Sequence, residues 1–240
     1  MNFYDNVAVL IPTYEMASEL KQTLECLQSQ KSSTYFQIVI VDDSVSDDVD
    51  YVVSEFSYMH SRDVKYIRRQ PHEGFRVASA WNILWRSADV GDDGILILTN
   101  SHILMRENWV AQHLAYHRGR DNVCVLGPYH EGGWGRPSTV GMWDDAGREK
   151  KKYTLLRCYS DSIRKKHLAA INGWDEVYDG EWGREDVDLA YRLQNIGIQW
   201  VRGDEVDVVH LSHAPRQETD RGIRNLKIFY EKFPELRGKV

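Results

Sequence analysis

A run of carboxylates, tryptophans and glycines over residues 172–193 carries the side chains best suited to chemistry, NGWDEVYDGEWGREDVDLAYRL. Its second half has apolar residues at the i, i+4, i+7 spacing of one helical face, namely Leu189, Leu193 and Ile196. Glu185 and Asp186 are therefore expected in the first helical turn, where free N–H groups and the helix dipole favour ionised carboxylates. An ionised aspartate at this position could accept a proton from a hydroxyl group.

Two tryptophans lie in the same run, on a segment otherwise rich in charge. Trp174 and Trp182 offer flat apolar faces for a sugar ring, and Gly183 lets the backbone approach a ligand closely. The alternative is a helix N-terminus with acidic capping residues and two tryptophans in the core. For the run as a whole we favour the functional interpretation, a sugar held beside a base.

The elements that must position these residues follow from hydrophobic patterns. Short apolar runs rich in β-branched residues predict buried strands at Val7–Ile11, Ile38–Val41, Val64–Ile67, Ile95–Leu98 and Val123–Gly127. Helical spacing predicts helices over 17–27, from Phe75 to Ala88, from Glu185 onward and over 217–233. This alternation predicts an α/β fold, a mostly parallel sheet flanked by helices, in a single domain covering residues 1–240.

The first two predicted strands deliver polar and aromatic residues to one sheet edge: Pro12, Thr13, Tyr14, Glu15, Asp42 and Asp43. Parallel strands place such residues beside a ligand crevice at their carboxyl ends. Neither a GxGxxG nor a GxxxxGK[ST] turn follows the first strand, so no glycine-rich loop cradles phosphates there. An aromatic, acidic crevice suits a nucleotide base, although aspartates at strand ends often merely cap the next helix.

Arg76 lies beside the N-terminus of the helix predicted from Phe75, where a guanidinium and free N–H groups could hold an anion together. An exposed surface ion pair is the alternative. Trp134, in a glycine-rich segment after residue 127, is a candidate for stacking on a sugar or on a base, with core packing as the alternative.

Three histidines at predicted strand ends form a possible metal triad. Asn100 and His102 follow the fourth strand, and His210 and His213 end an edge-like strand expected at Val206–Val209. Neutral imidazole binds transition metals well and Mg²⁺ poorly, which favours Mn²⁺. Zn²⁺ or Fe²⁺, or a weakened metal site, are the alternatives.

Bulk properties exclude several classes of protein. Charged residues make up 28% and hydrophobic residues 42%, which indicates a folded chain. No run of about 18 apolar residues and no signal peptide are visible, so we expect no membrane span and a cytoplasmic location. Three scattered cysteines argue against a disulfide frame, and a net charge of −6 argues against general binding to a nucleic-acid backbone.

Five of these segments resemble motifs of glycosyltransferase family two and of other inverting GT-A enzymes. WGRED resembles the WGGED segment near the acceptor site, with Arg184 in place of the second glycine. IPTYE and VDDS resemble the two opening motifs, and GFRVASAWN resembles GFRxAxxRN, with Trp81 where an arginine is usual. Asn-Ser-His at 100–102 is similar to the DxH variant of the metal-binding DxD motif.

The resemblance implies a GT-A, Rossmann-like fold with a nucleotide-binding half over residues 1–102 and an acceptor or catalytic half over 103–240. It implies that Asp186 deprotonates the acceptor hydroxyl, with Glu185 and Trp182 orienting sugar and acceptor. Asp43 would contact uracil and Arg76 would help to hold the nucleotide. His102, His210 and His213 would bind the cation on the donor diphosphate.

The predicted function is therefore an inverting, metal-dependent glycosyltransferase that uses a nucleotide-sugar, UDP-linked donor and a hydroxyl acceptor. The acceptor stays open between a glycan and, as the one role left for nucleic acid, a hydroxymethylated base in phage DNA. The main rival is a non-catalytic module that binds a nucleotide or glycan through a degenerate metal motif. A sugar nucleotidyltransferase would need a glycine-rich loop after the first strand, which is absent.

Overall fold

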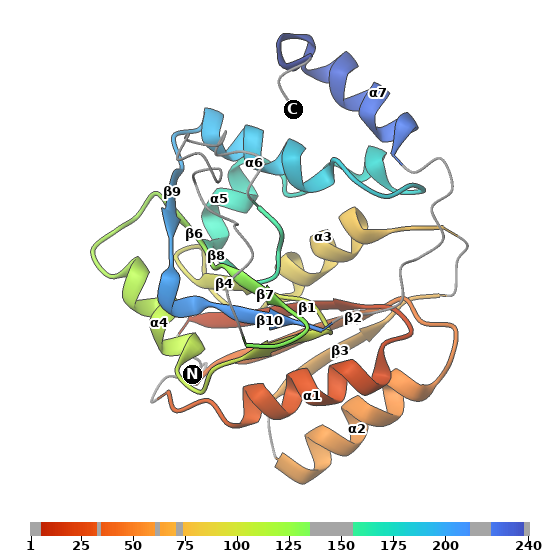
Figure 1. Cartoon of the computed structure of the whole chain (residues 1–240), viewed down its shortest axis with the longest axis vertical. Coiled ribbons are helices and arrows are strands. Elements are labelled where there is room, and N and C mark those ends of the chain that lie inside the picture. Colours follow the sequence, from red (N-terminus) through yellow and green to blue (C-terminus); the bar gives the residue numbers. More distant parts are fainter. Residues whose placement is uncertain are drawn as a thin grey trace.

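A twisted sheet of seven strands forms the middle layer of the protein (Figure 1). The structure is a computed structural model and describes residues 6–32, 35–60, 63–70, 74–134, 156–211 and 222–237. The strand order is β3-β2-β1-β4-β8-β6-β9. The strands are β1 (Val7–Thr13), β2 (Gln37–Asp42), β3 (Val64–Arg68), β4 (Ile95–Leu98), β6 (Val123–Leu126), β8 (Asp161–Arg164) and β9 (Gln199–Arg202).

One strand of this sheet runs against the others. β8 pairs antiparallel with both β4 and β6, whereas β1, β2, β3 and β4 are parallel, as are β6 and β9. The carboxyl ends of β1 and β2 meet in register, Thr13 beside Asp42. The predicted mostly parallel α/β fold is confirmed, and the predicted ligand edge has the expected neighbours.

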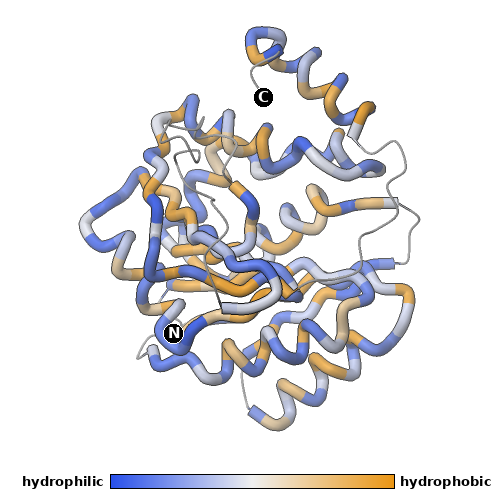
Figure 2. The backbone as a smooth tube through the Cα atoms, in the orientation of Figure 1, coloured by the Kyte–Doolittle hydropathy of each residue, from blue (hydrophilic) through white to orange (hydrophobic). Residues whose placement is uncertain are grey.

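Alternating side chains of β1 face two separate hydrophobic cores. Val7, Val9 and Ile11 pack under one set of helices, and Ala8 and Leu10 pack under the other. The first set is α1 (Ala17–Gln28), α2 (Asp48–His60) and α4 (Trp109–His117). The second is α3 (Val77–Ser87), α5 (Lys165–Ala170), α6 (Glu185–Asn195) and α7 (Ile223–Lys232). In Figure 2 the central strands are accordingly the most continuously apolar segments, because helices cover both faces.

A small second sheet lies at the carboxyl end of β4. Its order is β5-β10-β7, formed by β5 (Ile103–Met105), β10 (Val208–His210) and β7 (Tyr129–Glu131). The strand expected at Val206–Val209 is β10, which begins later, at Val208, because Asp204–Val206 forms a 3-10 turn. It is the central strand of the small sheet and not an edge strand. β1 continues through Pro12 to Thr13 instead of ending at Ile11. Two short 3-10 turns, Glu176–Tyr178 and Pro234–Leu236, lie before α6 and after α7.

Among the described residues, no helix is both long and apolar enough to cross a membrane. The cytoplasmic location stays a prediction.

Candidate active site

The carboxyl ends of β1 and β2 form the first wall of the site. The Asp43 N–H donates to the Thr13 carbonyl at 3.1 Å. Asp42 is fully buried and accepts hydrogen bonds from the Ser44 N–H (2.8 Å) and the Tyr66 hydroxyl (2.7 Å). The expectation that Asp42 contacts a ligand is therefore wrong, because its carboxylate is turned into the protein.

Asp43, by contrast, carries the charge at this wall. Its Oδ1 lies 2.7 Å from Arg69 Nε and 2.9 Å from Arg76 Nη2, and its side chain keeps 16% exposure. Burial raises the pKa of Asp43, while the two guanidinium groups oppose that rise. Arg76 thus lies at the predicted place, but it pairs with Asp43 instead of standing alone.

Glu15 joins the loop after β1 to the loop after β2. It has a left-handed backbone (φ 52°), and its carboxylate accepts from the N–H groups of Val45 (2.6 Å) and Ser46 (3.1 Å). A bond from the Ser46 hydroxyl lowers the pKa of Glu15. The adjacent Tyr14 is 43% exposed, and Pro12 is half-buried. Glu15 therefore shapes the loop that presents the Tyr14 ring.

The N-terminus of α3 already holds an anion from the protein itself. Asp179 accepts from the N–H groups of Ala78 (2.9 Å) and Ser79 (3.2 Å). Gly180 and Phe75 form a bridge alongside, with the Gly180 N–H donating to the Phe75 carbonyl at 2.6 Å. The expectation of free N–H groups for a ligand at this helix start is wrong, because a carboxylate about a hundred residues away caps them.

Two histidines that are distant in the chain meet beside the small sheet. The Nε2 atoms of His102 and His210 are 3.0 Å apart, and His210 Nδ1 lies 3.0 Å from a Glu131 carboxylate oxygen. The ring of Tyr159 lies 4.7 Å from that of His210, and the ring of Tyr129 lies 6.0 Å from it. Two of the three predicted metal ligands are thus together; His213 lies outside the described residues.

This pair fits a transition-metal ion. Two nitrogens about 2.1 Å from one ion are about 3.0–3.4 Å apart for angles from 90° to the tetrahedral value, so the 3.0 Å separation is at the short end of this range. Glu131 can accept the Nδ1 proton of His210, which leaves the Nε2 lone pair for a metal, the usual role of an outer carboxylate. Asn100 is not part of the pair, and its Nδ2 donates to the Cys158 carbonyl at 3.3 Å. The described residues contain no group of three or more His, Cys, Asp or Glu side chains that could hold a metal ion, so the pair alone supplies two nitrogens.

The predicted carboxylates stand at the start of α6, as expected. Gly183 (φ 98°) and Arg184 (φ 79°) both have left-handed backbones, and the helix begins at Glu185. Burial, and then the charge of Asp186, raises the pKa of Glu185 to about 8. Burial also raises the pKa of Asp186, but Arg157, with Nη1 3.6 Å away, favours its ionised form.

A turn at residues 157–161, which no sequence pattern marked, contacts both the carboxylates of α6 and the histidine pair. Asp161 is buried and accepts from the N–H groups of Arg157 (3.1 Å) and Cys158 (2.7 Å), and burial raises its pKa to about 7. Cys158 has a φ of 55°, and Thr99 donates to the Tyr159 carbonyl at 2.8 Å. Residues 157–161 lack any periodicity or known motif, so only their long-range contacts identify them.

The three tryptophans proposed for stacking differ in accessibility. Trp174 is 2% exposed and stacks on Trp81, with ring centroids 5.3 Å apart. The prediction that Trp174 stacks on a sugar is therefore wrong, because both rings are in the core. Trp182 is 61% exposed, and Trp134 is 47% exposed under the Arg106 guanidinium, 3.9 Å from its ring centroid.

This arrangement of a mostly parallel sheet with an added small sheet is the GT-A glycosyltransferase fold, and solved structures share it. GalNAc-T7 with UDP, GalNAc and Mn²⁺ is similar with a TM-score of 0.71 and 19% identity, over 89% of this chain and 45% of that one. TarS from S. aureus in complex with UDP-GlcNAc is similar with a TM-score of 0.69 and 16% identity, over 88% and 59%.

Residues 8–172 match glycosyl transferase family 2, and the chain belongs to this family. Residues 155–214 match the N-terminal domain of galactosyltransferase. Hyaluronan synthase of Pasteurella multocida is 23% identical over 276 residues, 98% of this chain and 28% of that protein. Validoxylamine A glucosyltransferase of Streptomyces hygroscopicus subsp. jinggangensis is 26% identical over 266 residues, 96% and 61%. The chain spans less than two thirds of the length of each of these relatives.

Proposed function

We propose that this protein moves a sugar from a UDP-linked donor to a hydroxyl group, with inversion and with the help of a divalent cation. One short turn carries the proposal, because it touches both chemical groups. Arg157 reaches Asp186 (3.6 Å), and the Tyr159 ring lies 4.7 Å from that of His210. Residues two apart have Cα atoms within about 7 Å, so the proposed base and the proposed cation ligand both contact residues of one turn.

The two carboxylates at the start of α6 are suited to different protonation states. Glu185, with a pKa raised to about 8, is protonated at neutral pH and can donate a hydrogen bond to the acceptor. Arg157 helps Asp186 to ionise first, so Asp186 accepts the proton of the attacking hydroxyl. General-base catalysis of this kind typically contributes about 10²–10⁴-fold in rate.

The histidine pair would hold the cation, with His213 as the third expected ligand. When bound, a divalent cation would neutralise charge developing on the leaving diphosphate. Mn²⁺ suits two imidazole nitrogens better than Mg²⁺ does. Glu131 fixes the orientation of His210 for this task.

The donor base is expected against Tyr14, with Asp43 and Arg76 at its edge. The UDP and UDP-GlcNAc named with two similar structures support a uridine donor. Trp182, which is exposed, would be the stacking surface for the sugar near the catalytic base Asp186. The synthase names of several relatives favour a glycan acceptor over a DNA base.

A donor-hydrolysis screen across nucleotide sugars, with and without Mn²⁺, identifies the donor. Asp186→Asn should then lower transfer to an acceptor by about 10²-fold or more while UDP binding is kept. Near-normal turnover of this variant would remove the base assignment.

The rival binding module is supported by the lack of a cluster of three ligand side chains among the described residues. Calorimetry separates the two readings: an enzyme should bind UDP more tightly when Mn²⁺ is present. A module without metal function should show no gain.

A further inference from the structure

One buried amide on α7 holds the loop that leads into the carboxylates. Asn225 is fully buried, and its Nδ2 lies 2.9 Å from the Tyr178 carbonyl, 3.1 Å from the Glu181 carbonyl and 3.0 Å from the Gly183 carbonyl. Its Oδ1 accepts from Arg224 Nη1 at 2.9 Å. Three carbonyl oxygens around one position require a donor there, which fixes the orientation of the amide.

The loop needs this partner because of its backbone shape. Gly183 and Arg184 are consecutive residues in the left-handed region, so the chain at this point can follow neither a strand nor a right-handed helix. A left-handed conformation costs a residue with a Cβ roughly 1–2 kcal/mol, so Arg184 needs outside support. The Gly183 carbonyl, which a regular element would pair, is paired by Asn225 instead.

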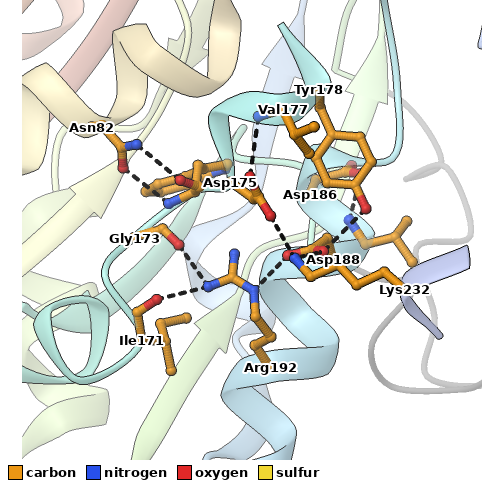
Figure 3. A network of polar contacts seen from close by, with 12 residues as sticks. Asn82, Ile171, Gly173, Asp175, Val177, Tyr178, Asp186, Asp188, Arg192 and Lys232 are labelled. Carbon is orange, nitrogen blue, oxygen red and sulfur yellow. Dashed lines mark hydrogen bonds and ion pairs between the residues drawn. The ribbon is translucent and has the colours of Figure 1, made fainter. Parts of the chain in front are cut away.

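The same helix holds the loop at two further points. Arg224 donates to the carbonyls of Val177 (3.0 Å) and Asp179 (3.2 Å). At the other end of α7, Lys232 reaches Asp175 (2.7 Å) and Asp188 (2.5 Å) (Figure 3). Among the described side-chain hydrogen bonds of α7, the one from Asn225 reaches Gly183, in the residue pair that directly precedes the carboxylates.

We infer that Asn225 is a positioning residue for sugar transfer: it fixes the backbone at residues 183–184 and so aims Glu185 and Asp186 at the acceptor. The inference rests on the proposed function. It makes α7, which carries no residue of the catalytic pair or the histidine pair, a part of the catalytic apparatus.

The test compares Asn225 with Lys232, because both attach α7 but only Asn225 reaches Gly183. In Asn225→Ala, hydrogen exchange at the amides of residues 183–187 should become faster. The kcat for transfer should fall about 100-fold, the effect of misplacing a catalytic group by about 1 Å. UDP affinity and donor hydrolysis by water should stay unchanged, because the donor wall lies on β1 and β2.

Lys232→Gln should lower thermal stability and leave both the local exchange and kcat near wild type. An equal loss of kcat in Lys232→Gln and Asn225→Ala would overturn the inference, since general docking of α7 would then explain both. So would an Asn225→Ala protein with unchanged exchange and kcat.

Asn225→Ser, which keeps one donor, serves if the alanine variant fails to fold, and it should show intermediate exchange and kcat. Wild-type levels of both in this variant would overturn the inference. The exchange measurement needs no substrate. If the wild-type protein neither binds UDP nor transfers a sugar, the proposed function is refuted. Faster hydrogen exchange in Asn225→Ala would in that case still support the local role of the Asn225 amide.

Discussion

Replacing Asp188 by asparagine should destabilise the protein strongly without touching the proposed chemistry. The Asp188 side chain is fully buried and bonds to the Tyr178 hydroxyl (3.1 Å), Arg192 Nε (2.5 Å) and Lys232 Nζ (2.5 Å). Figure 3 shows this network where α6, α7 and the loop before α6 meet. One carboxylate therefore balances two cations.

The cost of Asp188→Asn follows from the exposure of the two cations. Removing one partner of a buried ion pair costs about 3–5 kcal/mol. The side chains of Arg192 and Lys232 are 19% and 30% exposed, so water recovers part of the loss and we expect the lower end of the range. About 3 kcal/mol at roughly 2–4 °C per kcal/mol lowers the Tm by about 6–12 °C.

Asp175→Asn is the matched control, measured with Asp188→Asn by urea unfolding. Asp175 contacts the same Lys232 Nζ at 2.7 Å, but its side chain is 36% exposed. An exposed pair contributes about 0–1 kcal/mol, and asparagine can still accept the Val177 N–H bond that Asp175 accepts now. Equal losses in the two variants, or a loss below about 1 kcal/mol for Asp188→Asn, would refute the assigned role of burial.

Three other predictions concern a buried histidine, two tryptophans and a glutamate. Burial lowers the pKa of His117 to about 4 from 6.5, so the unfolded state takes up the proton first as the pH falls. Unfolding measured from pH 7 to 4 should show a loss of up to about 3.4 kcal/mol, at 1.36 kcal/mol per unit, that His117→Gln lacks. Trp174→Ala should cost about 3–5 kcal/mol in the same assay, whereas Trp182→Ala should cost less than about 0.5 kcal/mol and raise the KM for the acceptor. The kcat should decline above pH 8 as Glu185 ionises and loses its proton for the acceptor, and a pH profile of Glu185→Gln should lack that decline.

The long buried strands were predictable because a continuous run of apolar residues indicates a strand that is buried on both faces. Val7–Ile11 and Ile95–Leu98 are uninterrupted apolar runs, and strands covered on both faces need such runs. The small sheet was placed poorly, since strands of three residues such as Val208–His210 are too short to show a period. The reversed strand Asp161–Arg164 carries polar residues and has no strand pattern at all.

The site residues show a different limit, since residue type does not reveal accessibility. Trp174 and Trp182 are each flanked in the sequence by one glycine and one acidic residue. Trp174 nevertheless stacks on Trp81 in the core, whereas Trp182 is exposed. Asp42 and Asp43 are adjacent, yet only Asp43 faces the crevice edge. A side chain's direction is set by elements far away in the chain.

The anion expected at the start of α3 shows how contacts between residues distant in the chain change the function assigned to a helix N-terminus. Arg76 and a helix N-terminus together favour an anion, and an anion is there, but it is the protein's own Asp179. Because Asp179 belongs to the loop that leads into Glu185 and Asp186, these N–H groups tie that loop to the start of α3. The positive end of α3 is therefore satisfied within the protein, and under the proposed function other groups would meet the charge of a donor diphosphate. Under the proposed function, the pair His102 and His210 would hold the cation that meets this charge.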